Sequence, residues 1–354
     1  MTAEVKKIGL IGRIDPQGTL FDGQTVKTRT IWRMLRDRYG EENVVCVETM
    51  NYSREPLRVA RELVRCLHTC DEVVVLLSRN GRRAFFPILA WSAKHRGIRI
   101  YHNLIGGWLA RDVKEKPSIA TWLNAFEVNW VESCDLVEQL KELGVKNVEF
   151  LPNFKQIEPV PENELRSPKT KPFRLCTFSR VVEQKGILDA IEAVDSLCAR
   201  DGEDAWALDV YGPVDPSFKA DFERALAASS HTRYCGSTTP EDSVGVLKSY
   251  GALLFPTKWR PEGFPGTVID ALAAGIPVVA SKWRYYSEML EDGVTGFSYE
   301  FGGGSNDLIG AIDALASLDN DDMMHMKRAC VKRAGSYSAN ELFGQMAKKI
   351  ESKW

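Results

Sequence analysis

The feature that most constrains the fold of this chain is a regular alternation of short apolar segments with longer amphipathic ones. In the first half, strand patterns occupy residues 7–12, 44–48, 72–77, 98–103, 128–131 and 148–151. Helical patterns lie between them, at 25–39, 57–69, 84–96 and 135–143. The second half repeats the alternation, with strand patterns at 173–178, 207–211, 232–235, 252–256 and 277–280. Strands that alternate with helices are typical of parallel sheets covered on both faces, so we predict an α/β, doubly wound fold.

The length of the chain predicts two domains, because 354 residues exceed what a single hydrophobic core usually supports. We place an N-terminal Rossmann-like domain at 1–155 and a C-terminal one at 173–337. Residues 156–172 are rich in proline and charge, which is typical of a linker. Ligands of such folds bind beyond the carboxyl ends of the strands, so we expect a central cleft faced by both sheets, which closes around this hinge.

Charge and cysteine usage narrow the class of protein. Residues 1–155 carry 24 Lys and Arg against 19 Asp and Glu, whereas residues 156–354 carry 22 against 29. The overall net charge of −2 argues against nucleic acid as the main partner. Eight cysteines are scattered without a framework, and no apolar run approaches the roughly 20 residues of a membrane span. We therefore expect a cytoplasmic protein without a signal peptide.

The segment RPEGFPGTVIDALAAGIPVVAS, residues 260–281, has the pattern of a loop, a short helix and a buried strand. Glu262 lies in the loop, and Asp270 follows eight positions later on the helix. The pattern directs the unpaired N–H groups of a helix N-terminus toward a loop that carries a carboxylate. This arrangement suits an anionic ligand that also bears hydroxyl groups.

A second segment places two cations where a strand ends and a helix begins. Arg180 and Lys185 follow the first strand of the second half, and Gly186 comes directly after them. A diphosphate needs such donors, since a guanidinium makes forked contacts and an ammonium acts as a point charge. An arbitrary pair of this kind is more often two solvated surface cations, but the position at the carboxyl end of a strand favours a phosphate site.

Together these segments resemble the signature of retaining, nucleotide-sugar-dependent glycosyltransferases of the GT-B fold, family 4. The resemblance covers nearly the whole chain and is strongest over 128–152 and 173–297. It implies that Arg180 and Lys185 stabilise the pyrophosphate as the sugar leaves, while Glu262 lies close to the donor sugar. Asp270 stands where the family usually has a glutamate that bonds the ribose hydroxyls, and it is one methylene shorter. The other donor-binding residues implied are Gly23, Gly212, Gly236, Ser237, Gly263, Phe264, Pro265, Gly266 and Thr267.

His102 is the fourth catalytic candidate, after Arg180, Lys185 and Glu262. It ends the strand pattern at 98–103, on the edge of the sheet where the cleft is expected. The family often has a histidine in the matching strand, so the resemblance implies contact with the donor sugar or the acceptor. A lone histidine is more often structural, and His68, His95, His231 and His325 have no such placement.

The resemblance implies hexosyl transfer with retention, from a nucleotide-diphosphate sugar to a glycan, lipid-linked or other acceptor, in polysaccharide or glycoconjugate biosynthesis. It implies no cofactor and no essential metal, and a final helix, about 338–354, that packs on the first domain. Two alternatives stay open. A sugar-nucleotide epimerase of the same architecture would convert the donor without an acceptor, whereas a non-catalytic subunit would bind sugar nucleotide without turnover.

Basic residues are concentrated in the first half, and some lie beside aromatic ones. The helical segment 25–39 contains Lys27, Arg29, Arg33, Arg36 and Arg38, the segment 57–65 adds three arginines, and Arg79, Arg82 and Arg83 precede Phe85-Phe86. Each helix alone is ordinarily a solvated face around a buried stripe. Their concentration nevertheless suggests peripheral association with an anionic membrane, such as the inner face of the cell membrane.

Overall fold

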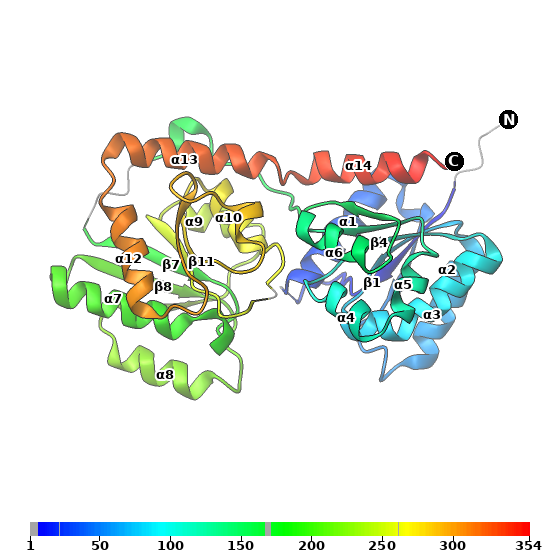
Figure 1. Cartoon of the computed structure of the whole chain (residues 1–354), viewed down its shortest axis with the longest axis horizontal. Helices are drawn as coiled ribbons and strands as arrows, with labels where there is room; N and C mark the ends of the chain where they lie inside the picture. Colours follow the sequence, from blue (N-terminus) through cyan, green and yellow to red (C-terminus); the bar gives the residue numbers. More distant parts are fainter. Residues whose placement is uncertain (1–5, 21, 167–170, 261) are drawn as a thin grey trace. The chain divides into compact units, whose positions relative to one another are not determined.

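The computed structural model of the chain describes residues 6–20, 22–166, 171–260 and 262–354. It divides into two compact units (Figure 1). The first unit comprises Met1–Gln156 together with Ala339–Trp354, and the second comprises Ile157–Ser338. Each unit is built around a six-stranded sheet in which every pairing is parallel, as the alternation of strands and helices predicts.

The first unit has the strand order β2-β1-β3-β4-β5-β6. Strand β1, the second in this order, pairs on one side with β2 and on the other with β3, and Ile8 is in register with both Val44 and Glu72. The strands are β1 (Ile8–Gly12), β2 (Val44–Glu48), β3 (Glu72–Leu76), β4 (Arg99–Asn103), β5 (Val128–Val131) and β6 (Val148–Phe150). All residues of β1 and β3 are buried, which explains why these strands are apolar without alternation, apart from Glu72 at the start of β3, which is paired with Arg99.

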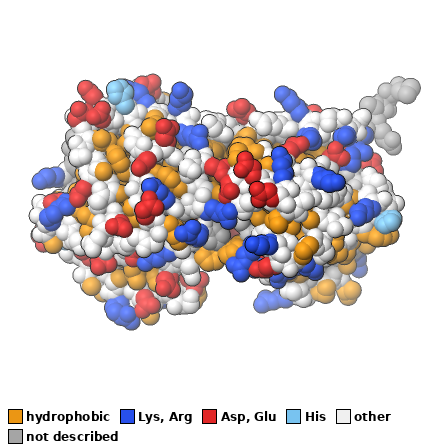
Figure 2. All heavy atoms as spheres, viewed as in Figure 1, with side chains coloured by type: hydrophobic (Ala, Val, Ile, Leu, Met, Phe, Trp, Pro, Cys, Tyr) orange, Lys and Arg blue, Asp and Glu red, His pale blue; other side chains and the backbone are white. Residues whose placement is uncertain are grey.

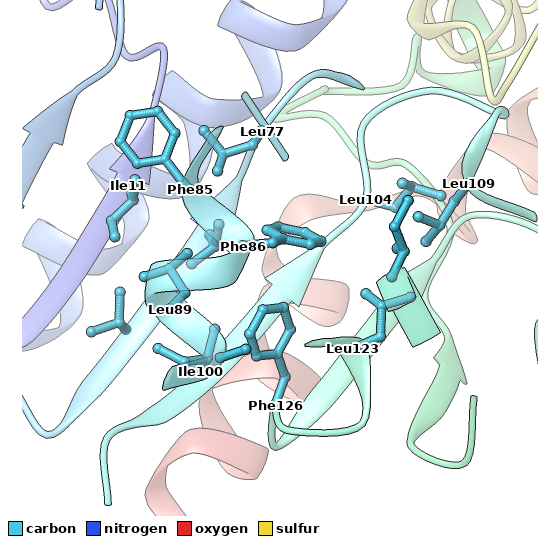
Figure 3. Close-up of a cluster of buried hydrophobic side chains, with 14 of the residues drawn as sticks. Ile11, Leu77, Phe85, Phe86, Leu89, Ile100, Leu104, Leu109, Leu123 and Phe126 are labelled. Atoms are coloured by element: carbon cyan, nitrogen blue, oxygen red, sulfur yellow. The ribbon is translucent and has the colours of Figure 1, made fainter. Parts of the chain in front are cut away.

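Helices cover both faces of this sheet (Figure 1). Helices α1 (Gly23–Tyr39) and α14 (Ala339–Glu351) lie on one face, where Leu35 and Phe343 join the cluster around Ile8. The other face is covered by α2 (Pro56–Thr69), α3 (Arg79–Arg96), α4 (Leu109–Glu115), α5 (Ser118–Leu123) and α6 (Cys134–Glu142). Figure 3 shows part of that second cluster, in which Phe86 of α3 lies near Phe126 with ring centroids 5.1 Å apart.

The second unit has the strand order β12-β11-β10-β7-β8-β9. Its strands are β7 (Phe173–Phe178), β8 (Trp206–Tyr211), β9 (Thr232–Gly236), β10 (Ala252–Phe255), β11 (Val278–Ser281) and β12 (Gly296–Tyr299). Helices α7 (Ile187–Asp201), α8 (Lys219–Ala228) and α12 (Ser305–Ala316) contribute to one core cluster. Helices α9 (Ser243–Leu247), α10 (Gly266–Ala273), α11 (Tyr286–Met289) and α13 (Asn320–Gly335) contribute to the other.

Part of the segment expected as a linker packs against the second unit instead. The Val160 amide donates to the carbonyl of Ala273 at 2.8 Å, and both Val160 and Leu165 are buried. These two apolar side chains account for the packing, because leaving them in water would forgo the free energy of burying them. The short 3₁₀ turn Glu162–Glu164 lies between them.

Across the described part of the chain, every helix is too short or too polar to span a bilayer.

Candidate functional site

The candidate site of the second unit lies where β7 and β10 end. These strands are neighbours in the sheet, with Leu175 in register with Ala252, so their carboxyl ends lie at the same edge. The chain leaving β7 passes through Arg180 to the 3₁₀ turn Glu183–Lys185 and then enters α7. The chain leaving β10 leads through Thr257 to Glu262 and then to α10. Two segments far apart in the sequence therefore meet at this edge.

Lys185 and Glu262 form an ion pair at this meeting point, through Nζ and Oε2. Each side chain is 15% exposed, so the pair is largely withdrawn from water while its outer surface stays accessible. The Lys185 ammonium also lies 5.2 Å from the centre of the Phe255 ring, within range of a cation–π interaction. The structure thus brings together two of the residues that the sequence predicts to be catalytic.

Backbone hydrogen bonds hold these two loops in place. The Lys258 amide donates to the carbonyl of Gln184 at 2.8 Å, and the Thr257 hydroxyl lies 3.3 Å from the same carbonyl. Gly186 has φ +66°, and a Cβ there would overlap the carbonyl of Pro256. Glycine is required at this position because the two backbones approach so closely. Lys185 is therefore presented from a rigid turn.

Thr257 is a site residue that sequence reasoning missed. It is buried, and its hydroxyl lies 3.4 Å from Glu262 Oε2. Its carbonyl accepts a 2.6 Å hydrogen bond from the Ser281 hydroxyl at the end of β11. A polar residue two positions after an apolar strand was the available signal, since Thr257 follows the end of β10 by two residues, as Arg180 follows the end of β7.

Arg180 lies on the surface of the second unit. Among the described residues, its side chain has no hydrogen-bond or ion-pair partner, although its charge acts on Asp215. Hydrogen bonds from Ser217 are the main cause that lowers the pKa of Asp215, and Arg180 adds to the effect. Arg180 is therefore a free guanidinium beside the loop that leads to Lys185, and it is available to an anion.

Gly212 and Gly236 lie side by side, where β8 and β9 end. The Gly212 amide donates to the Gly236 carbonyl at 2.8 Å, and both residues have positive φ, at +129° and +75°. A Cβ on Gly212 would overlap the carbonyl of Ser179, whereas a Cβ on Gly236 would meet nothing within 4 Å. Ser237 is exposed beside them. These turns lie on the same sheet edge as Lys185, because all six strands are parallel.

Helix α10 begins at Gly266, and no side-chain hydrogen bond from the described residues caps it. The Thr267 hydroxyl in its first turn is buried and, within the part of the chain that the structure describes, has no partner. An uncapped helix start with a spare hydroxyl suits an anionic or hydroxylated ligand. Gly263 and Pro265 are half-buried in the loop that leads to it.

Two predicted donor-binding residues are buried. The Phe264 ring belongs to the core of the second unit, 6.3 Å from the Tyr337 ring. Asp270 is also buried in α10.

A buried network around Asp209 of β8 was not predicted. Its carboxylate accepts hydrogen bonds from Tyr250 at 2.7 Å and from Arg174 and Arg233. Burial raises the pKa of Asp209, but the hydrogen bonds from Arg233, Tyr250 and Arg174 outweigh it and lower the pKa overall. The Tyr250 hydroxyl is also hydrogen-bonded to the Tyr211 hydroxyl at 2.8 Å, so the network supports the end of β8, directly before Gly212.

In the first unit, Gly23 is the first residue of α1. Asp22 precedes it as the N-cap, and its carboxylate accepts a hydrogen bond from the Thr25 amide at 3.3 Å. A Cβ on Gly23 would meet none of the described residues within 4 Å, so their packing does not itself require glycine there. Gly12 is different, because a Cβ there would crowd Thr28 and the carbonyl of Leu76. A polar hollow lies at this edge of the sheet, with Arg13, Gln24, Thr49, Asn51 and Ser78 among its lining residues.

His102 does not line a cleft, in contrast to our expectation. Its side chain is 0% exposed and lies in the core of the first unit, with its ring edge-to-face against Phe86 at 5.0 Å. The side-chain NH₂ group of Asn129 donates to the Leu123 carbonyl, so its Oδ1 faces His102 and accepts a hydrogen bond from His102 Nδ1 at 3.0 Å. Helices cover both faces of the sheet, so residues 100–103 of β4 are all buried, and the ring of His102 lies on the face that is covered by α3.

Burial makes His102 an acid-sensitive element of the first unit. Desolvation, aided by the charges of Arg82 and Lys27, lowers its pKa from 6.5 to about 3. The unfolded chain therefore binds the proton more tightly, so stability is lost as pH falls from about 6.5 toward 3. The free energy of unfolding of the wild type should therefore fall between pH 7 and pH 4, and we expect His102→Gln to reduce this fall by about 3 kcal/mol.

Urea unfolding of both proteins at the two pH values would measure this effect. His325→Gln is the matched control, because His325 is exposed. An equal loss of stability for the wild type and His102→Gln would contradict the prediction.

Comparison with solved structures defines the fold. The structure of HepE from Anabaena in complex with UDP has a TM-score of 0.74 and 16% sequence identity, and the match covers 98% of this chain and 100% of that one. The structure of a glycosyltransferase from Rickettsia africae has a TM-score of 0.69 and 15% identity, covering 98% of both chains. The two Rossmann-like units therefore have the GT-B fold.

Similarity to a protein family is found in the second unit. Residues 162–333 match the family model described as "Glycosyl transferases group 1", and this range includes Arg180, Lys185, Glu262 and Asp270. The second unit therefore carries the sequence pattern of this glycosyltransferase family.

Curated relatives support the same family. The amylovoran biosynthesis glycosyltransferase AmsK of Erwinia amylovora is 28% identical over 149 residues, which is 40% of this chain and 36% of AmsK. The glycogen synthase of Mycobacterium tuberculosis is 27% identical over 169 residues, 48% of this chain and 39% of the enzyme. The matched regions thus span little more than a third of each relative.

Proposed function

We propose that this protein is a retaining glycosyltransferase that moves a hexose from a nucleotide-diphosphate sugar to a glycan, lipid-linked or other acceptor. The observation that carries the proposal is the accessible Lys185–Glu262 pair at the carboxyl edge of the second sheet, inside the region that matches the family. Arg180 and the start of α10 lie at the same edge, and within the described ranges neither has a side-chain hydrogen-bond partner.

The chemistry follows from where charge develops. As the bond between the sugar and the diphosphate breaks, negative charge grows on the departing phosphate, and groups that are already in place stabilise it best. Lys185 and Arg180 would supply positive charge there, and the first-turn N–H groups of α10 would add donors. Glu262, an acceptor of hydrogen bonds, would orient the hydroxyls of the sugar. Because these cations serve the leaving group, we propose that no divalent metal and no cofactor is essential.

The donor and acceptor are proposed from the relatives. HepE was solved with UDP and with UDP-glucose, which makes a uridine-diphosphate hexose the first donor to test. AmsK acts in amylovoran biosynthesis, and another structural neighbour is a lipopolysaccharide outer core galactosyltransferase, which supports a polysaccharide or glycoconjugate acceptor. We propose that residues of the first unit hold the acceptor. Asp270 would reach the ribose hydroxyls less easily than a glutamate, because its side chain is shorter by about 1.5 Å.

The proposal is tested by calorimetric titration with UDP, followed by product analysis with UDP-hexoses and an acceptor panel in the presence of a chelator. We expect UDP to bind, and Glu262→Ala to reduce turnover by about a hundredfold or more. The product should keep the anomeric configuration of the donor, as seen by NMR. Epimerised donor without transfer would instead show an epimerase, and binding without turnover would show a non-catalytic subunit.

A further inference from the structure

Helices α2 and α3 of the first unit share a surface that is apolar and basic at once. The two helices are neighbours, since the ring of Tyr52, just before α2, packs 5.7 Å from the ring of Phe85 in α3, and Arg96 contacts His68 at 3.2 Å near the ends of the two helices. Both helices contribute to the same core cluster, so their outward faces form one surface. In Figure 2, orange and blue side chains lie close together where Figure 1 labels these helices.

The apolar side chains of this surface are the most exposed of their kind among the described residues. Leu57 is 83% exposed and Val64 55% on α2, while Ile88 is 48% and Trp91 56% on α3. No other large hydrophobic side chain that the structure describes exceeds 45%. Four large apolar side chains that stay in contact with water do not stabilise the folded unit. Their clustering therefore indicates an interaction surface.

The positive charge of the surface indicates which kind of partner it binds. Arg61, Arg65, Arg83 and Lys94 are exposed on these helices, and within the described residues none forms an ion pair. Helix α3 contains no acidic residue, and the single one of α2, Glu62, is paired with Arg58 at 2.9 Å. A surface that combines unpaired cations with exposed aliphatic and tryptophan side chains matches an anionic lipid bilayer, whose headgroups attract the cations and whose interface accepts the apolar groups.

Most of the residues from which the sequence suggested a membrane surface are buried or paired in the structure. Phe85 and Phe86 point into the core (Figure 3), and Arg82 is buried against Asp112 at 2.9 Å. On α1, the cations Lys27, Arg29, Arg36 and Arg38 are all paired with carboxylates.

We propose that the α2–α3 face, defined by Leu57, Arg61, Val64, Arg65, Arg83, Ile88, Trp91 and Lys94, docks the protein onto an anionic bilayer. The cations hold the surface near the headgroups, and Trp91, Ile88, Val64 and Leu57 enter the interface. Docking would bring the first unit to the lipid surface, and it does not depend on which reaction the second unit catalyses.

Vesicle sedimentation tests the proposal with the full chain, without donor or acceptor. We expect partition onto vesicles of phosphatidylcholine with about 30% phosphatidylglycerol to exceed that onto phosphatidylcholine alone by about tenfold or more, and to fall as salt is added. The double variant Arg61→Glu, Arg65→Glu should weaken this binding by at least about tenfold. The double variant Ile88→Ser, Trp91→Ser should weaken it several-fold, because apolar burial is lost.

The matched control is Lys332→Glu with Lys348→Glu, two exposed lysines on α13 and α14 that make the same change in net charge elsewhere. We expect its binding to stay within about twofold of the wild type. Far-UV circular dichroism would verify that each variant is folded. Equal binding to neutral and anionic vesicles, no binding to either, or equal loss in the control and the α2–α3 variants would each overturn the proposal.

Discussion

Replacing Lys185 with alanine is expected to lower kcat by about a thousandfold with a UDP-hexose donor. The change removes the ammonium that we propose stabilises the departing diphosphate. It also leaves the Glu262 carboxylate without its ion-pair partner, so a negative charge would face the phosphates. Both effects raise the barrier to bond cleavage rather than weakening acceptor binding, so the loss should appear in kcat. Steady-state kinetics with saturating donor and acceptor would measure it.

The control for this experiment is Lys282→Ala, which removes an exposed lysine that is paired with Glu300 rather than with Glu262. Lys282→Ala should retain the wild-type kcat within about twofold, because surface ion pairs contribute little to the stability of the fold. Lys185→Arg should recover part of the lost activity, because it restores the charge with a different geometry. A fall of less than about tenfold for Lys185→Ala, or 1.4 kcal/mol in the barrier, would contradict the assigned role.

Replacing Gly212 with alanine is expected to destabilise the second unit by about 4 kcal/mol. Gly212 has φ +129°, a conformation unfavourable for alanine, and the added Cβ would overlap the Ser179 carbonyl. Relieving the overlap would push β8 away from the loop that carries Arg180. The free energy of unfolding in urea, followed by circular dichroism, gives the measurement.

The variant Gly236→Ala separates the cost of the backbone conformation from the cost of the steric overlap. Gly236 also has positive φ, at +75°, but its added Cβ would have no neighbour within 4 Å. Only the backbone strain then remains, so we expect a loss of about 1 kcal/mol. Similar losses for the two variants would show that the close approach to Ser179 is not what requires glycine at position 212.

Much of the candidate site could be predicted because its signals are local. Lys185 and Glu262 each stand shortly after an apolar strand, and parallel strands bring such positions to one edge of the sheet. Gly186, Gly212 and Gly236 could be placed at turns because they follow strands or open a helix. Thr257 was missed because a threonine after a strand is common, and its role depends on contacts with Gln184 and Glu262.

The sequence by itself determined the alternating elements, the two parallel sheets and the positions of the loops, because periodicity and turn residues act over a few neighbouring positions. Only the tertiary structure decided which side chains are paired, buried or free. Lys185 and Glu262 are 77 residues apart, and His102 is enclosed by Phe86 and Phe126 from other segments. Burial and ion pairing depend on partners that the chain brings together only on folding, so a local pattern could not separate the buried Phe86 from the exposed Trp91.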